Sequence, residues 1–374
     1  MPVRKGKRYL IMEEILKKTV VQTIKEYASL SEQQQSLHPK LLELAYQEGW
    51  FKLFVPPVYG GPGKTLPEIL RLEEAIAAAD GSLGWTVTLC SGAGWFAGFL
   101  DPDLANNLLA DEKVCFAGSG EIGGTATLTA NGNYLINGSW RYASGALHAT
   151  VFTANCILLN KDGSQQSTDD GNPLVLSFIL KKEEINIIPG WSYFGLVATG
   201  SHAFEAKSVT VPANRSFKIN EIVNAESLGL GFDYPFLQMA ETTLAVNIHG
   251  MSRHFIVLAA ESFEQRTGLK RYTSSQINYF NDILVASKAR MNEVRTAFYE
   301  AFELSWKALQ QKSLTEALLS DVSTKSRILA HTSIEISDKL YPFCGLNAAR
   351  KETTINRVWR DIHTASQHSL LTFP

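Results

Sequence analysis

The last part of the chain carries four long stretches with helical spacing of apolar residues and almost no internal glycine or proline. These stretches cover residues 234–263, 275–309, 314–341 and 355–370. Helices of this length bury their apolar faces most readily against one another. The sequence therefore predicts a C-terminal four-helix bundle domain over residues 221–374.

The first part of the chain also has a helical pattern. Leu41, Leu44, Ala45 and Glu48 follow the spacing of one helix face, and Asp101-Pro102 is typical of a helix start. We expect an N-terminal helical domain over residues 1–112.

The pattern changes from about residue 114. Residues 125–129 alternate, Asn131-Gly132 predicts a hairpin turn, and a strand over residues 134–136 leads to a second turn signal at Asn137-Gly138. Further apolar runs at 151–159, 174–180 and 208–211 are typical of strands. Residues 113–220 are therefore expected to form a small β domain between the two helical ones.

Charge and composition exclude several classes of protein. The chain has 374 residues with 35 Lys and Arg against 37 Asp and Glu, a net charge of -2. Nucleic acids and anionic membranes select a clear positive excess, so neither is an expected partner. Residues 83–100 carry no charge and contain a GxxxG, yet they are short and rich in Gly, Ser and Thr. We expect a helix buried in protein rather than a membrane span.

The cysteines and the N-terminus point to the cytoplasm. Cys90, Cys115, Cys156 and Cys344 are isolated in sequence, without CxxC or Cys/His spacing, which predicts reduced core residues, no disulfide framework and no metal site. Glutamates at 13 and 14 interrupt the first apolar stretch, so no export signal is expected.

Four segments of the sequence carry a family resemblance. The segment 134–148, Tyr-Leu-Ile-Asn-Gly-Ser-Trp-Arg-Tyr-Ala-Ser-Gly-Ala-Leu-His, together with Trp-Ser-Tyr-Phe-Gly at 191–195 and Thr-Gly-Ser at 199–201, resembles the middle domain of the acyl-CoA dehydrogenase superfamily of flavoproteins. The C-terminal run 357–368, Arg-Val-Trp-Arg-Asp-Ile-His-Thr-Ala-Ser-Gln-His, resembles the oxygenase components of two-component flavin-dependent monooxygenases of the 4-hydroxyphenylacetate 3-hydroxylase type.

The resemblance implies a fold and an activity. The fold would be α+β and multidomain, with an N-terminal α-helical domain, a central β-barrel-like domain and a C-terminal four-helix bundle, assembled as a homotetramer. The activity would be hydroxylation of an aromatic or cyclic small molecule by O2 through a C4a-hydroperoxyflavin. The reduced flavin would come from a separate flavin reductase.

The end of the strand at 134–143 is the expected flavin face. Strand alternation predicts that Trp140 and Tyr142 share one face, with Ser144 continuing that side into a turn. By resemblance, Tyr142 stands where dehydrogenases stack an aromatic ring on the flavin, and Ser144 where they bond the N5 region. From the residues alone, an aromatic strand packed on the core with a turn serine is the favoured interpretation, and only the resemblance reverses it.

Two Gly/Ser segments are further cofactor-binding candidates. Gly118 and Ser119 offer flexible backbone amides, and so do Thr199, Gly200 and Ser201. Such loops also join elements without any ligand.

His368 is the candidate catalytic residue. It lies where acyl-CoA dehydrogenases with a C-terminal base carry Tyr-Glu-Gly-Thr, so the usual carboxylate is missing. On a continuous helix Asp361 and His368 would share one face. The imidazole could donate to a peroxide or accept a phenol proton. Alternatively, Arg360 and Asp361 form an ion pair and His368 is an ordinary polar residue.

Trp85, Trp359 and His148 are expected to line the substrate site, although a histidine after a strand is often simply half exposed.

The sequence also favours one cofactor and leaves two rival functions open. Ala260 and Glu264 replace an arginine and a glycine that help hold FAD in related dehydrogenases, which favours reduced FMN over reduced FAD. No Rossmann-type unit, in which GxGxxG joins a strand to a helix, is expected for NAD(P)H. The first rival is an FAD-dependent acyl-CoA dehydrogenase with Glu241 as its base. The second is a non-catalytic protein with this fold.

Overall fold

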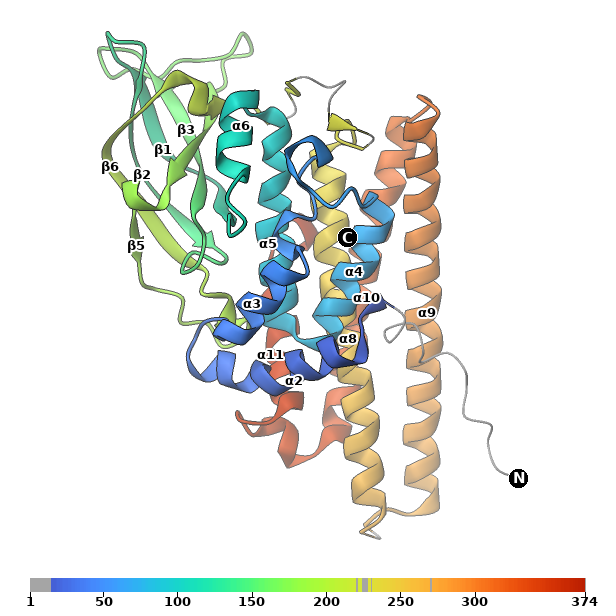
Figure 1. Cartoon of the computed structure of the whole chain (residues 1–374). Coiled ribbons are helices and arrows are strands. Elements are labelled where there is room, and N and C mark those ends of the chain that lie inside the picture. The colour runs from blue at the N-terminus through green and yellow to red at the C-terminus, as the bar shows by residue number, and fades with distance from the viewer. Residues whose placement is uncertain (1–14, 220, 224–227, 230, 270, 374) are drawn as a thin grey trace.

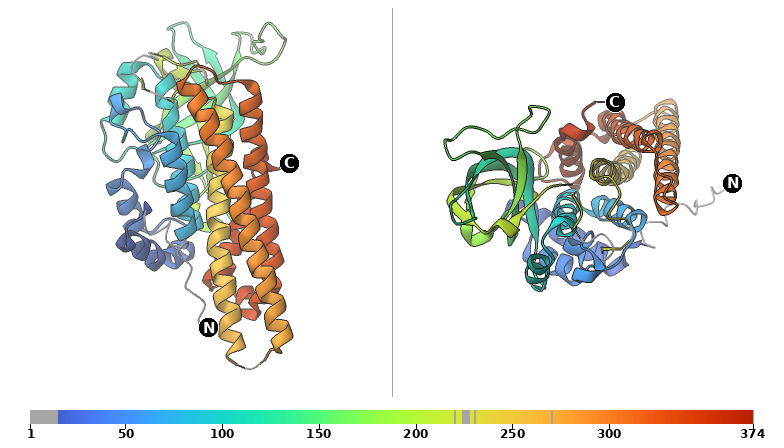
Figure 2. Two further views of the ribbon diagram at one scale, coloured as in Figure 1. Left: turned by 90° about the vertical axis from the view of Figure 1, so that its right-hand side faces the viewer. Right: turned by 90° about the horizontal axis from the view of Figure 1, so that it is seen from above.

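The computed structural model describes residues 15–219, 221–223, 228, 229, 231–269 and 271–373. The glutamates at 13 and 14 lie outside these residues. Helices occupy the first and last parts of the chain and strands the middle, as the change of sequence pattern predicts (Figure 1). Seen from above, the curved sheet lies beside the helices rather than between them (Figure 2).

The α-helices in the described residues are α2 (Lys18–Gln33), α3 (Pro39–Gln47), α4 (Leu66–Ala79), α5 (Gly81–Gly94), α6 (Pro102–Leu109), α8 (Phe236–Thr267), α9 (Ser274–Gln310), α10 (Glu316–Leu340) and α11 (Thr354–Ala365). The strands are β1 (Phe116–Leu128), β2 (Tyr134–Ala143), β3 (Val151–Leu159), β4 (Val175–Lys181), β5 (Asn186–Ile188), β6 (His202–Val211) and β7 (Ser216–Phe217).

The helix start predicted at Asp101-Pro102 is confirmed. Pro102 is the first residue of α6, and the Asp101 side chain accepts hydrogen bonds from the amides of Asp103 and Leu104. These are two of the amides that a helix leaves unpaired at its start.

The strands form one sheet in the order β5-β6-β2-β1-β3-β4-β7. The hairpin predicted at Asn131-Gly132 joins β1 to β2, and Gly132 has a φ of +76°. The second predicted turn, at Asn137-Gly138, is wrong, because both residues lie inside β2 and Gly138 pairs with Gly124. A Cβ on Gly138 would lie 2.5 Å from the Gly124 Cα and 2.8 Å from the Trp140 ring. Gly138 therefore serves close packing and not a turn.

The long helices pack lengthwise on the other side of the molecule. α8 packs on α4 and α10, α10 also packs on α9, and α11 lies against α8. Figure 2 shows α8, α9 and α10 side by side over most of their length. Glu74 of α4, fully buried, accepts hydrogen bonds from Arg253 of α8 and from Arg295 and Tyr299 of α9. Ionic contacts therefore add to apolar packing between these helices.

The uncharged run at residues 83–100 is split between α5 and a 3-10 helix, Trp95–Phe99. Most of its side chains are buried against other parts of the chain. Among the described helices, none is both long and apolar enough to cross a bilayer. The expectation of a helix buried in protein is confirmed for α5, which lies between the sheet and α4 (Figure 1).

Candidate functional site

Tyr142 lies at the end of β2 in an unusual backbone conformation. Its φ is +63°, and the pairing of β2 with β6 shifts register between Trp140 and Ala143. The shift breaks the alternation of side chains, so the expectation that Trp140 and Tyr142 share a face is wrong. Tyr142 is 45% exposed, whereas Trp140 is fully buried, stacks on Phe204 and donates its indole N–H to the Asn155 carbonyl at 2.9 Å. Trp140 is thus a core residue with no surface left for a cofactor.

Two aromatic side chains from the loop between β5 and β6 lie beside Tyr142. Its ring centroid is 6.5 Å from that of Trp191 and 6.2 Å from that of Tyr193, and the two tyrosine hydroxyls are 3.3 Å apart. Trp191 and Tyr193 are themselves 4.2 Å apart. We call Tyr142, Trp191 and Tyr193 the aromatic wall. An exposed aromatic group next to a left-handed non-glycine residue is typical of a functional site.

A chain of hydroxyl groups runs inward from the turn after Tyr142. Ser144 Oγ lies 2.9 Å from Ser201 Oγ, which lies 2.7 Å from Thr199 Oγ1. Thr199 Oγ1 in turn donates to the Leu196 carbonyl at 2.8 Å. The three hydroxyl-bearing residues are buried. Ser144, Thr199 and Ser201, which the sequence names as cofactor-binding candidates, therefore lie together, although their role stays a prediction.

The donor and acceptor roles along this chain of hydroxyl groups follow from the carbonyl group at its inner end. The Leu196 carbonyl can only accept, so the Thr199 hydroxyl proton points to it. Thr199 Oγ1 must then accept from Ser201, and Ser201 Oγ must accept from Ser144. The Ser144 proton therefore points inward, and its remaining lone pair is available to accept a hydrogen bond from a ligand.

Asp361 of α11 holds the inner end of the hydroxyl chain. Its buried Oδ1 accepts the backbone N–H of Leu196 at 2.6 Å, where the chain turns with a φ of +51°. Burial, together with the charge of Asp80, raises the pKa of Asp361 to about 8. A carboxyl group with this pKa is mainly protonated at neutral pH. Asp361 thereby fixes the loop that carries Thr199.

The ion pair considered between Arg360 and Asp361 does not form. Arg360 instead binds Glu32 of α2, the Phe194 carbonyl and, at 2.7 Å, the Asn356 side chain. The two neighbouring side chains point in different directions because they are adjacent on a helix. Arg360 ties α2 and the Phe194 loop to α11.

His368 lies outside α11. The helix predicted over residues 355–370 ends at Ala365, and His368 instead caps a short 3-10 turn, Ser369–Leu371. Its Nδ1 accepts the Leu370 N–H at 3.4 Å. The expectation that Asp361 and His368 share a helix face is wrong, because the chain leaves the helix between them.

The surroundings of His368 determine its protonation. Its ring lies 6.1 Å from that of Trp85 on α5, in an edge-to-face contact, and burial lowers the pKa of the imidazole. The ring is then neutral at pH 7. Because Nδ1 accepts a hydrogen bond, the single proton is on Nε2, which can donate to a ligand. Trp85 and His368, both predicted site residues, therefore lie together.

The other backbone candidates have a local explanation. Gly118 lies in β1, where a Cβ would collide with the Thr153 hydroxyl on β3. The Ser119 hydroxyl accepts the Glu121 N–H at 3.1 Å. Gly200 has a φ of +53°, which glycine tolerates between Thr199 and Ser201. Of these, Gly200 belongs to the hydroxyl chain by position.

His148 has a ring neighbour different from that of His368, which contacts Trp85. The His148 ring centroid is 5.3 Å from that of Phe51. One ring nitrogen of His148 and the sulfur atoms of Cys90 and Cys115 all lie within 4.8 Å of one another. All four cysteines are buried and free, as predicted. Cys90 and Cys115, although distant in sequence, meet where α5 contacts the start of β1. Cys90 Sγ also donates to the Ser144 carbonyl at 3.4 Å.

Trp359 has its own set of neighbours. Its ring lies 4.2 Å from that of His363, 4.8 Å from Tyr341 and 6.3 Å from Phe194, and its indole N–H donates to Asp338 at 3.3 Å. These contacts hold Trp359 against α10 and the loop that bears the aromatic wall.

Glu241, the base of the rival mechanism, is engaged elsewhere. It is buried on α8, and its Oε1 accepts from Arg327 of α10 at 2.7 Å. An ion pair between two helices explains this carboxylate without catalysis.

The chain is similar in sequence to known proteins. The family model "Acyl-CoA dehydrogenase, C-terminal domain" matches residues 242–373. The flavin-dependent monooxygenase oxygenase subunit HsaA of Rhodococcus jostii (strain RHA1) is 23% identical over 366 residues, which cover 93% of this chain and 91% of that protein. The p-hydroxyphenylacetate 3-hydroxylase oxygenase component of Acinetobacter baumannii is 21% identical over 362 residues, which cover 94% and 83%.

Solved structures show the same fold. XiaF from Streptomyces sp. in complex with FADH2 and glycerol superimposes with a TM-score of 0.84 at 18% identity, covering 97% of this chain and 92% of that one. FMN-bound TdsC from Paenibacillus sp. A11-2 gives 0.77 at 16% identity, with 97% and 94% covered. The chain has the acyl-CoA dehydrogenase fold, and the two sequence relatives described above are named as the oxygenase subunit of a flavin-dependent monooxygenase and the oxygenase component of a hydroxylase. The resemblance expected from the sequence is confirmed.

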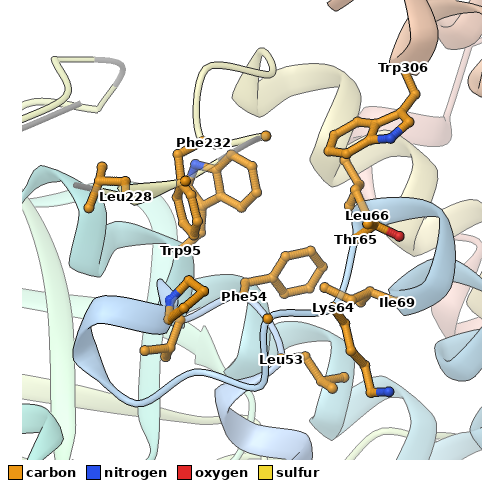
Figure 3. Close-up of a pocket in the computed structure, with 15 residues that line it drawn as sticks. Leu53, Phe54, Lys64, Thr65, Leu66, Ile69, Trp95, Leu228, Phe232 and Trp306 are labelled. Atoms are coloured by element: carbon orange, nitrogen blue, oxygen red, sulfur yellow. The ribbon is translucent and has the colours of Figure 1, made fainter. Parts of the chain in front are cut away.

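An apolar cavity of about 160 Å³ is lined by a different set of residues. Figure 3 shows Phe54, Trp95, Phe232 and Trp306 around it. Among the described residues that line it, none is a predicted site residue. The cavity is therefore separate from the Ser144 and His368 positions.

Proposed function

We propose that the chain is the oxygenase component of a two-component flavin-dependent monooxygenase and that it hydroxylates an aromatic or cyclic small molecule with O2. The names of its relatives support this function, since both sequence relatives are oxygenase subunits or components. Within this protein, the donor and acceptor roles along the hydroxyl chain support the proposal. Ser144 can accept a hydrogen bond from N5–H, which a reduced flavin has and an oxidised flavin lacks.

The residues of the proposed site fit two parts of a bound flavin, its flat ring and its N5 side. The partly exposed rings of the aromatic wall offer an apolar surface for the flavin ring, with the Ser144 hydroxyl next to Tyr142 in the chain. When bound, the reduced flavin would supply the reaction with O2. Ser144 would accept from its N5 side, and Gly200 and Ser201 would keep that serine in place. Backbone amides near Gly118 and Ser119 remain candidates for its polar edge.

His368 would be the acid of the site. Its Nε2–H can donate to an oxygen of the reacting groups, because Nδ1 is occupied by the Leu370 amide. This favours donation over removal of a phenol proton, the other role considered from the sequence. Trp85 would close the site against water and contact a flat substrate, and Trp359 would support the loop behind the aromatic wall. The hydroxyphenylacetate relative supports an aromatic substrate.

We propose reduced FMN as the preferred flavin, with FAD as the alternative. Ala260 and Glu264 carry no positive charge for the second phosphate and adenine. The nearby Arg266 is already bound to the Phe343 carbonyl and the Tyr272 hydroxyl. Solved structures with this fold contain either FADH2 or FMN, so both flavins are compatible with the fold.

The proposed partners are a separate flavin reductase and other copies of this chain. A chain named an oxygenase component implies a second component that reduces the flavin. Assembly as a homotetramer through the long helices is supported by exposed apolar side chains on α9, where Tyr279 is 62% and Val285 67% exposed.

Anaerobic titration with reduced and oxidised FMN and FAD tests the proposal. We expect the reduced forms to bind more tightly, with reduced FMN at least equal to reduced FAD. Tighter binding of the oxidised forms would contradict the direction assigned to Ser144. Failure of all four to bind would favour a non-catalytic protein with this fold.

A further inference from the structure

Three metal-binding side chains meet beneath the turn that carries Ser144. Cys90 comes from α5, Cys115 directly precedes β1, and His148 follows the turn after β2. One ring nitrogen of His148 and the two sulfur atoms lie within 4.8 Å of one another. Both cysteines are completely buried. These three residues, which we call the Cys–Cys–His cluster, come from parts of the chain that no sequence spacing connects.

One ring nitrogen of the histidine in this cluster has no hydrogen-bond partner among the described residues. His148 Nε2 is buried and unpaired among the described residues, although burial of an unpaired polar nitrogen costs free energy. The Phe51 ring, 5.3 Å away, cannot replace a hydrogen bond. An ion between the nitrogen and the two sulfurs would satisfy it.

Glycine keeps the space between these side chains open. Gly145 has a φ of +78°, and a Cβ there would lie 2.6 Å from Cys90 Sγ and 3.2 Å from His148 Nε2. A larger residue would fill the position where Cys90 and His148 approach each other.

The donor set matches a soft divalent cation. Zn2+ binds thiolate sulfur at about 2.3 Å and imidazole nitrogen at about 2.0 Å, so neighbouring ligand atoms in a tetrahedral site are about 3.3 to 3.8 Å apart. The present separations are compatible with small side-chain movements. Two thiolates would neutralise the ion, which favours such a site in a buried place. The Ser144 carbonyl, 3.4 Å from Cys90 Sγ, is within reach of the fourth position.

We propose that Cys90, Cys115 and His148 bind one Zn2+ ion, which fastens α5 to the start of β1 and to the turn that carries Ser144. The ion is structural in this proposal. It does not depend on the proposed monooxygenase function, because it concerns the back of the turn and not the exposed aromatic wall.

Metal analysis of the full chain tests the proposal. The protein is produced with Zn2+ or Co2+ in the medium, and loosely bound ions are removed by a weak chelator. We expect stoichiometric metal and, with Co2+, the thiolate charge-transfer and tetrahedral absorption bands. Cys90→Ser, Cys115→Ser and His148→Ala should each lose them. Cys156→Ser is the matched control, because Cys156 is also buried and free but lies in β3 away from the cluster.

A second measurement covers the case in which a variant fails to fold. X-ray absorption at the zinc edge of the unmodified protein should show two sulfur ligands. Metal-free wild-type protein, equal metal in the cluster and control variants, a shell without two sulfurs, or a disulfide between Cys90 and Cys115 would each overturn the proposal. Flavin titration of the same samples reports separately on the monooxygenase function.

Discussion

The carboxyl group of Asp361 accepts the backbone N–H of Leu196 at 2.6 Å, joining two residues that are 165 positions apart in the chain. Leu196 also accepts from the Trp191 indole and the Thr199 hydroxyl through its carbonyl oxygen. A side chain on the last long helix thereby supports both the aromatic wall and the hydroxyl chain that ends at Ser144.

The first prediction concerns the proton on Asp361. Its native pKa is about 8 and its ordinary value 3.8, so between these values the folded protein binds a proton that the unfolded chain has released. The free energy of unfolding must therefore fall as pH rises from about 4 to about 8. Asp361→Asn, which resembles the protonated form and still accepts from Leu196, should remove this contribution. Urea unfolding at pH 6 and pH 9 should show a smaller loss of stability in the variant.

The charges around Asp361 make this prediction specific. Glu32 pairs with Arg357 and Arg360, Asp80 pairs with Arg357, and the charges of Asp80, Arg357 and Glu32 all act on Asp361. The group thus has three acids against two bases. One proton retained on Asp361 makes the net charge of these five groups zero. Asp361→Ala is the control, because it loses the acceptor for Leu196 and should cost about 1–3 kcal/mol at both pH values. An unchanged pH slope in Asp361→Asn would show that another group carries it.

The second prediction tests the direction of the hydroxyl chain. Thr199→Val keeps the shape of the side chain but removes the acceptor that orients Ser201, so Ser144 would be free to turn its proton outward. We expect weaker binding of reduced flavin and a smaller preference over oxidised flavin, by about 1–3 kcal/mol. Ser144→Ala should lose the same preference. Anaerobic titration of both redox forms measures it.

Thr210→Val is the matched control for this change, since Thr210 is exposed on β6. It should leave both affinities unaltered. Equal losses for both redox forms in Thr199→Val would mean that the threonine only supports packing.

The third prediction concerns His368. If its Nε2–H donates to the reacting oxygen, His368→Ala should bind flavin and consume O2 but release it as hydrogen peroxide, with product lowered roughly 10²- to 10⁴-fold. Because burial lowers the pKa of this histidine, wild-type coupling should hold at neutral pH and change only as pH falls below the ordinary value of 6.5. Product and peroxide are measured together over pH 5 to 9.

Gln367→Ala provides the control for His368→Ala, because Gln367 is the exposed neighbour in the same turn. It should keep wild-type coupling. Normal product yield in His368→Ala would remove the histidine from the reaction.

The sequence predicted more of the fold than of the site. Long periodic helices and the change to alternation identify the order of elements, because burial imposes these periods along the chain itself. The register shift after Trp140 and the end of α11 at Ala365 depend on contacts between distant segments. They reversed the expected orientation of Trp140 and the position of His368.

The same limit explains the residues that the sequence did not reveal. Cys90 and Cys115 meet only when α5 packs on β1, and no spacing between them indicates that contact. Asp361 lies in the C-terminal motif at residues 357–368. Its partner could not be predicted, because the amide of Leu196 is a backbone group that any residue could provide.

The last prediction separates the monooxygenase from the rival acyl-CoA dehydrogenase. Glu241 is buried in an ion pair with Arg327 at 2.7 Å, so Glu241→Gln should act on stability and leave the partly buried guanidinium of Arg327 without its charged partner. We expect a loss of about 1–3 kcal/mol in urea unfolding, with flavin binding and product formation retained.

The rival mechanism predicts the opposite for the same variant. A dehydrogenase would need Glu241 to remove an α-proton, so an acyl-CoA would bleach the bound flavin in the wild type and in His368→Ala but not in Glu241→Gln. A monooxygenase would show no bleaching in any of the three and would lose product only in His368→Ala. Assaying the two variants side by side with acyl-CoA and phenolic substrates distinguishes the mechanisms, because each mechanism makes a different carboxylate or imidazole indispensable. Bleaching that disappears only with Glu241→Gln would refute the oxygenase assignment, whatever the stability of the variant.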